Sequence, residues 1–206
     1  MKKMIEAKQT LKWPKYRVNF YSGYYRVRQQ DANDDGAVCF VAHHFNAVAS
    51  AKPEYVLCNV GSNASSKSIA WARDYAKLVG QAFGYPLFNN DGICIGGMGG
   101  RGDSQLRYTR MPAILPEPLF CSNPEHAAIL RSDHGRQALA EILVDSIRMH
   151  FPAGGLVAFS IGHLGNPAAP GDRGALVYAQ PDEPILWEAD VAADVLKRAQ
   201  RLLEHP

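Results

Sequence analysis

The sequence lacks the long apolar run that a transmembrane helix requires. No stretch approaches the roughly 18 consecutive apolar residues that are typical of a membrane span. The N-terminal residues MKKMIEAKQTLKWPKYR carry positive charge without the apolar segment that follows it in a secretory signal peptide. These absences predict a protein that is synthesised in the cytoplasm and has no membrane partner.

An excess of one charge and closely paired cysteines are also missing. Lysine and arginine total 22 against 20 aspartate and glutamate residues, which gives a net charge of +2 at pH 7. No basic run adds to this small excess, so nucleic acid is not expected as a partner. The cysteines contain no C-x-x-C pair, and we expect them to be small buried apolar side chains. They are Cys39, Cys58, Cys94 and Cys121.

Internal repeats, linkers and low-complexity tails are likewise absent, so we expect a single catalytic domain over residues 1–206. Strand candidates alternate with amphipathic helix candidates along the chain. The strand candidates are 16–22, 36–45, 53–62 and 156–161, and the helix candidates are 65–84, 135–151 and 188–204. This alternation predicts an α/β fold with a mostly parallel central sheet flanked by helices.

Histidines stand at the ends of two predicted strands. His44 lies in the segment VAHHFNA, where one predicted strand ends, and His163 follows the apolar run LVAFSI after one glycine. Ligands of such folds gather at the carboxyl ends of the strands, which places both histidines near one cleft. Since neighbouring strand side chains point to opposite faces, Asn46 should point with His44 and His43 should point away. His126 follows a Ser-Asn-Pro turn and is expected at the surface.

Three glutamates could complete a reactive site. Glu188 opens the last predicted helix on its apolar face, where a carboxylate needs a partner charge or a metal. Glu183 lies between prolines shortly before it and is an alternative ligand. Glu117 ends the apolar run MPAILPE, where prolines keep the backbone out of a helix. Two histidines and one carboxylate form a catalytic zinc set, and a further glutamate can accept a proton from water.

These segments resemble, in rotated order, motifs of the zinc-dependent N-acetylmuramoyl-L-alanine amidases, a family of cell-wall amidases. The segments that resemble the family's histidine-x-asparagine strand, its catalytic glutamate motif and its closing helix are VAHHFNA, MPAILPEPLFCSNPEHAAIL and ALAEILVDSIRMHF. The family's opening Gly-His strand and first helix are resembled by the two segments that come last here, SIGHLGNPAAPGDRGA and EADVAADVLKRAQRLLE. The chain therefore looks like a circular permutant of the amidase domain.

The resemblance implies a peptidoglycan hydrolase. By analogy, His44, His163 and Glu188 would hold Zn²⁺, Glu117 would be the catalytic base, and Asn46 is a candidate for substrate binding. The bond cleaved would join the lactyl group of N-acetylmuramic acid to L-alanine in peptidoglycan or a muropeptide. Two departures from the family pattern stand out: GHLG replaces Gly-His-Gly-Gly, and Pro118-Leu119 replace a residue and glycine.

Two other functions remain open. Another zinc amidohydrolase, for example a carboxypeptidase-like enzyme, would need a set of arginines that clamps a substrate carboxylate. The candidates for that set are Arg101, Arg107, Arg110 and Arg173. A non-catalytic domain that binds cell-wall fragments is the second alternative.

The Gly-rich segment 84–105 is either a border of the substrate groove or a plain surface loop. Without a signal peptide, we expect the protein to act at the cell wall after release or delivery, as an endolysin does.

Overall fold

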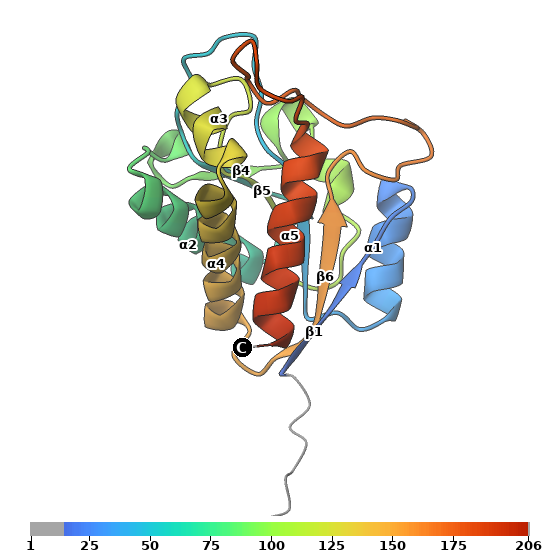
Figure 1. The fold of residues 1–206 in the computed structure, drawn as a ribbon. Coiled ribbons are helices and arrows are strands. Elements are labelled where there is room, and N and C mark those ends of the chain that lie inside the picture. The colour runs from blue at the N-terminus through green and yellow to red at the C-terminus, as the bar shows by residue number, and fades with distance from the viewer. Residues whose placement is uncertain (1–14, 206) are drawn as a thin grey trace, which may run out of the picture.

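A computed structural model describes residues 15–205, which form an α/β fold around one six-stranded sheet (Figure 1). The expectation that the N-terminus is no signal peptide concerns residues 1–17, of which 1–14 lie outside the described part. The strands are β1 (Tyr16–Phe20), β2 (Cys39–His43), β3 (Leu57–Val60), β4 (Ile93–Ile95), β5 (Ala113–Glu117) and β6 (Gly155–Ile161). The helices are α1 (Tyr25–Asp34), α2 (Ser66–Phe83), α3 (Pro124–Arg131), α4 (Asp133–His150) and α5 (Glu188–Glu204).

The sheet is mostly parallel, as the sequence predicts. Its strand order is β1-β6-β2-β5-β3-β4. The first four strands in this order run parallel, and β3 pairs antiparallel with β5 and parallel with β4. Pairing of β2 with β6 ends at His43 opposite Ile161. The carboxyl ends of β2, β5 and β6 therefore meet at one edge, which is where the reactive side chains lie.

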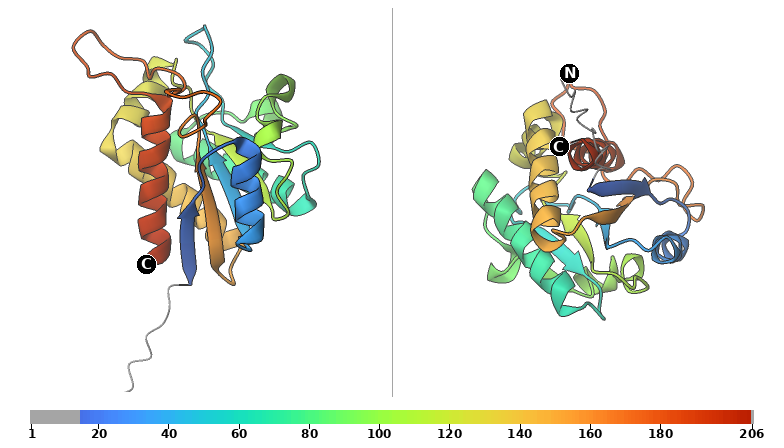
Figure 2. Two further views of the ribbon diagram at one scale, coloured as in Figure 1. Left: turned by 90° about the vertical axis from the view of Figure 1, so that its right-hand side faces the viewer. Right: turned by 90° about the horizontal axis from the view of Figure 1, so that it is seen from below.

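Helices cover the two faces of the sheet unequally. The larger core cluster joins one face of the sheet to α2, α4 and α5, with Trp71, Leu143 and Val195 fully buried. Helix α1 lies on the opposite side of the sheet from α5, as both views of Figure 2 show. Helices α2 and α5 lie where the sequence predicts helices, at 65–84 and 188–204, because the apolar stripe of each marks a helix. Helix α2 also has a serine cap at Ser65 and a left-handed Gly84 after its end.

Helix α1 was not predicted from the sequence. Its segment YRVRQQDAND has no apolar stripe, and the residues that it buries are Arg28, Gln29 and Ala32. Polar contacts therefore attach this helix. Gln29, for example, donates to the Ser104 carbonyl at 2.8 Å and accepts from the Tyr108 amide at 2.8 Å. Periodicity of apolar residues cannot detect a helix that is packed through such groups.

The prediction for His126 was wrong, while that for the cysteines agrees with the structure. His126 is fully buried, and its Nδ1 accepts a hydrogen bond from the Phe120 amide at 2.9 Å. The proline-containing turn before it leads into α3, which turns His126, Ala127 and Leu130 inward. Three of the four cysteines are buried, Cys94 is half-buried, and all are free thiols.

The described ends of the chain lie close together. Figure 1 shows the C-terminal end of α5 beside the start of β1, and the Val18 amide donates to Glu204 Oε1 at 2.9 Å. The link between α4 and β6 is short, comprising residues 151–154. Within residues 15–205, no helix combines the length and the hydropathy that crossing a bilayer requires.

Candidate metal centre

Three side chains from distant parts of the sequence converge at the carboxyl edge of the sheet. His44 directly follows β2, His163 follows β6 after one glycine, and Glu188 is the first residue of α5. His44 Nδ1 and His163 Nε2 each lie 3.1 Å from Glu188 Oε1. Each residue offers one ligand atom, and these atoms all lie within 4.8 Å of one another. Two imidazoles and one carboxylate are the donor set of an open zinc site.

Glycines allow this convergence. A Cβ on Gly174 would lie 2.4 Å from Glu188 Oε2 and 2.6 Å from the His163 ring, and a Cβ on Gly162 would lie 2.5 Å from His44 Nδ1. Real Cβ atoms do not approach other atoms so closely, so any other residue would displace the ligands. The two glycines thus leave room for the three donor groups to lie as close together as a shared metal ion requires.

The Glu188 carboxylate is held as an anion. It is 3% exposed, and the Phe45 and Ala175 amides donate to its two oxygens at 3.1 Å each. Its position in the first turn of α5 also favours negative charge. Burial acts to raise the pKa of Glu188, but hydrogen bonds and charge from His163 and His44 outweigh it and lower this pKa far below the usual range.

The two histidines are oriented by partners that the sequence analysis missed. Asp172 Oδ2 lies 2.8 Å from His163 Nδ1, and Gln105 Oε1 lies 3.0 Å from His44 Nε2. Burial lowers the pKa of His163, yet the Glu188 and Asp172 carboxylates outweigh it and raise this pKa to about 9. Partners of this kind fix the ring orientation of histidine ligands. Neither residue stands at a strand end, so only the spatial arrangement identifies it.

Glu117 lines the same cavity as the three donors, which has a volume of about 520 Å³. It ends β5, beside the strand that carries His44. Burial raises the pKa of Glu117, while the charge of His44 and a hydrogen bond with Asn59 lower it in part. The Asn59 side chain is buried, and its Oδ1 has no hydrogen-bond partner among the described residues. A half-buried carboxylate with a raised pKa is suited to take and return a proton.

Other predicted residues divide between the cavity and the rest of the molecule. Asn46 lines the cavity, whereas His43 points into the core and its ring lies 5.0 Å from that of Phe45. Glu183 is exposed and lies 3.4 Å from Arg131, away from the histidines. The structure therefore favours Glu188 over Glu183 as the third donor.

The Gly-rich segment borders the cavity through several of its residues. Those that line it are Met98, Arg101, Gly102 and Gln105. Of the four candidate arginines, Arg101 alone lines this cavity. Arg107 pairs with Asp103, Arg110 lies 3.9 Å from Asp34, and Arg173 pairs with Asp190. A clamp of several arginines for a substrate carboxylate is thus not assembled here by the residues predicted for it.

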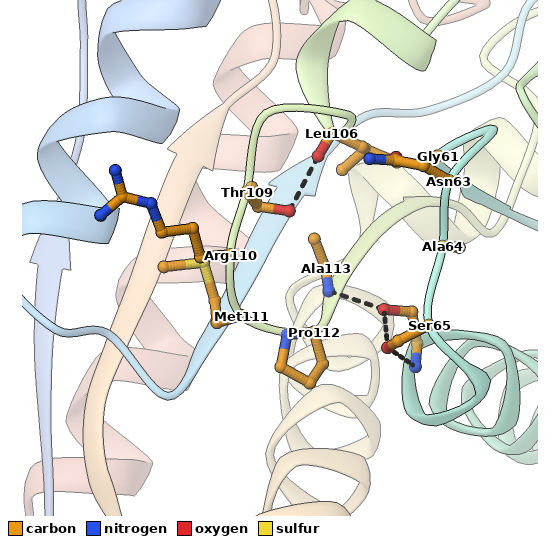
Figure 3. Close-up of a pocket in the computed structure, with 11 residues that line it drawn as sticks. Gly61, Asn63, Ala64, Ser65, Leu106, Thr109, Arg110, Met111, Pro112 and Ala113 are labelled. Atoms are coloured by element: carbon orange, nitrogen blue, oxygen red, sulfur yellow. Dashed lines mark hydrogen bonds between the residues drawn. The ribbon is translucent and has the colours of Figure 1, made fainter.

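A second cavity, of about 350 Å³, lies near the start of β5 (Figure 3). Among the described residues that line it there is no histidine, cysteine or carboxylate, and Arg110 is the single charged one. Ser68 Oγ accepts from the Ala113 amide at 3.1 Å, so part of its polar wall is already occupied. This cavity therefore lacks the groups for hydrolytic chemistry, and we place the functional site at the first cavity.

The fold and the site together define an α/β protein with a His-His-Glu centre at the carboxyl edge of its sheet. The chain belongs to the N-acetylmuramoyl-L-alanine amidase family, whose model matches residues 3–149. This confirms the resemblance seen in the sequence. The match contains β1 to β5 and nearly all of α4, and it ends before β6 and α5, which carry His163 and Glu188. No curated protein gave a significant match.

Solved structures of amidases have a similar fold. The catalytic domain of CwlV from Bacillus (Paenibacillus) polymyxa var. colistinus is 25% identical, with a TM-score of 0.52 over 63% of this chain and 66% of that one. An N-acetylmuramoyl-L-alanine amidase from Clostridium difficile 630 is 20% identical, with a TM-score of 0.53 over 62% and 65%. Ami1 from Mycobacterium smegmatis is 20% identical, with a TM-score of 0.54 over 63% and 61%. The chain thus spans slightly less than two thirds of the length of each.

Proposed function

We propose that the protein is a zinc-dependent amidase that cleaves the bond between the lactyl group of N-acetylmuramic acid and L-alanine in peptidoglycan or muropeptides. The observation that carries this proposal is the convergence of His44, His163 and Glu188 in the cavity that Glu117 also lines. Family membership supports the substrate class.

His44, His163 and Glu188 would hold the zinc ion. Nitrogen and oxygen donors of this kind are typical of catalytic zinc sites that leave one position open. When bound, the ion would supply Lewis-acid polarisation of the scissile carbonyl and acidify water. Asp172 and Gln105 would keep the two imidazole rings in place, and the Phe45 and Ala175 amides would keep the Glu188 carboxylate from turning away.

Glu117 would move the proton. Its carboxylate would accept a proton from the attacking water and then donate that proton to the departing L-alanine amine. The raised pKa caused by burial favours this second step, because a strongly acidic carboxyl would hold the proton too briefly. Asn46 lies on the same cavity wall and would hydrogen-bond the substrate amide or sugar, since its side chain offers both a donor and an acceptor.

We also infer that the chain is a circular permutant of the family's domain. The family match ends at residue 149, just before the segment that resembles the family's opening strand. Adjacent termini make such a rotation compatible with an unchanged core. Here β1 lies beside the end of α5, and residues 151–154 make the connection that the rotation requires. A crystal structure superposed on an amidase would test this: β6 and α5 must overlay the family's first strand and first helix.

Product analysis tests the activity. Digestion of purified peptidoglycan should release free N-terminal L-alanine together with intact lactyl-bearing muramic acid, and a chelator should stop the release. A C-terminal amino acid as the product would instead favour a carboxypeptidase, and Arg101 would then be the first candidate to bind the carboxylate. Binding of peptidoglycan without any new ends would favour a wall-binding domain. We expect the protein to reach its substrate at the cell wall after release or delivery.

A further inference from the structure

Arg28 is a buried cation on the helix that the sequence did not predict. It is 1% exposed, and within residues 15–205 it forms no salt bridge with a carboxylate. Burial of an unpaired charge is unfavourable unless every donor finds an acceptor. The acceptors of the Arg28 guanidinium therefore show which part of the chain this residue holds in place.

The guanidinium binds the chain on both sides of His163. Its Nη1 donates to Ser160 Oγ at 2.9 Å and to the Ile161 carbonyl at 3.0 Å, and its Nη2 donates to the Leu164 carbonyl at 2.6 Å. Its Nε donates to the Gly23 carbonyl at 2.8 Å, which ties the clamp to the start of α1. A planar fork with fixed donors suits this task, because it spans acceptors that a single ammonium cannot reach together.

The turn that Arg28 spans is strained. His163 has a φ of +62°, and the Leu164 amide donates to the Gly162 carbonyl at 2.7 Å. This is a three-residue turn with positive φ at a residue that has a side chain, which is a rare conformation. Such backbone persists only where the surroundings hold it. The last sheet contact before the turn is the Gly162 amide to the His43 carbonyl at 2.9 Å, so the sheet alone does not reach past it.

We propose that Arg28 is a positioning residue that holds the left-handed turn at His163 and thereby aims this imidazole at Glu188. Asp172 sets the rotation of the ring, and Arg28 sets the backbone from which the ring projects. The link to metal affinity and turnover rests on the proposed function. The effect on the backbone does not, because it is a property of the metal-free protein.

The test compares Arg28→Lys with Arg136→Lys in the full chain. Arg136 is a matched control: its guanidinium donates to the Leu130 and Arg131 carbonyls and to Asp194, within the helical layer. Amide hydrogen exchange of the zinc-free proteins is measured over residues 160–166, together with zinc affinity by chelator competition, kcat and KM. For Arg28→Lys we expect exchange in this segment to be at least tenfold faster, zinc affinity to fall at least tenfold, and kcat to fall with KM unchanged.

Wild-type exchange and zinc affinity in Arg28→Lys would overturn the proposal, as would equal losses in both variants. If Arg28→Lys does not fold, Ser160→Ala decides, since it removes one acceptor and leaves the cation. Faster exchange at residues 160–166 in Ser160→Ala supports the clamp, and unchanged exchange refutes it. A wild-type protein that neither binds zinc nor cleaves peptidoglycan would refute the proposed function, while the exchange comparison would still decide the role of Arg28.

Discussion

His44 and His163 reach the same carboxylate from segments that are built differently. His44 extends directly from β2, whose residues are all buried, and it needs no special backbone. His163 stands in a left-handed turn at the start of the long segment that joins β6 to α5. The sheet fixes the backbone that carries the first imidazole, and Gln105 orients its ring, whereas Arg28 and Asp172 hold the second in a turn outside the sheet. The difference teaches that the two sides of the centre are held in different ways. The side of His44 and Glu117, at the ends of the buried strands β2 and β5, is held by the core, and we call it the rigid side. The side of His163 depends on local polar contacts.

The largest effect is expected on the rigid side, from Glu117→Gln. The amide keeps the size of the side chain but cannot accept the proton, so kcat should fall by about 10²–10⁴-fold. Zinc content should stay at the wild-type level because Glu117 is not among the three donors. The rate at which N-terminal L-alanine is released measures kcat, and atomic absorption measures the zinc content. Turnover at the wild-type rate would remove Glu117 from the role of base.

Gly174→Ala should disrupt the other side of the centre, which depends on local polar contacts. The new Cβ would meet Glu188 Oε2 and the His163 ring, so the donors must separate and zinc affinity should fall by more than tenfold. Gly171→Ala is the matched control, because Gly171 also has a positive φ, of +84°, but has no atom near its Cβ position. Chelator competition on both variants gives the difference. Equal affinities would mean that the centre is not as tightly packed as described.

Asp172→Ala should have a smaller effect on the same side. Loss of the partner of His163 Nδ1 frees the ring to turn, and loss of such partners costs about 10–100-fold in metal affinity. Asp182→Asn, which alters an exposed carboxylate of the same loop, is the control. Zinc affinity is measured for both variants. A loss in Asp172→Ala alone comes from the orientation of the His163 ring, and not from the loss of a negative charge in this loop. A loss shared by both variants would contradict the role given to Asp172.

The smallest effect concerns stability near the rigid side, through His126. Burial lowers the pKa of His126 to about 4, below the unfolded value of about 6.5, so the unfolded chain binds more protons between these values. Stability is therefore full above pH 6.5 and decreases as the pH falls toward 4, by at most about 3 kcal/mol. Denaturant unfolding at several pH values measures this dependence. The His126→Gln variant should show a flatter profile, and an unchanged slope would assign the dependence to other groups.

Much of the rigid side could be predicted from the sequence. Apolar runs that end in His44 and Glu117 identify strands and the residues at their carboxyl ends, because alternation and strand ends follow from local geometry. Glu188 at the start of an amphipathic helix could be placed for the same reason. Gln105 and Arg28 could not be predicted, since each acts through a contact with a residue far away in the chain. Asp172 lies only nine residues after His163, but the loop between them has no periodic pattern that would place the two side chains together. The buried His126 was misplaced because a turn motif does not show which way the next helix packs.

The sequence by itself determined the α/β fold and made His44, His163 and Glu117 candidates for the centre, because periodic apolar patterns and strand ends are properties of neighbouring residues. The tertiary structure decided that Glu188 and not Glu183 faces the histidines, and that a polar helix carries Arg28 to the turn at His163. These decisions depend on which distant groups share a small buried volume, where each donor must meet an acceptor. No local pattern records that pairing, and only the folded chain brings the partners together.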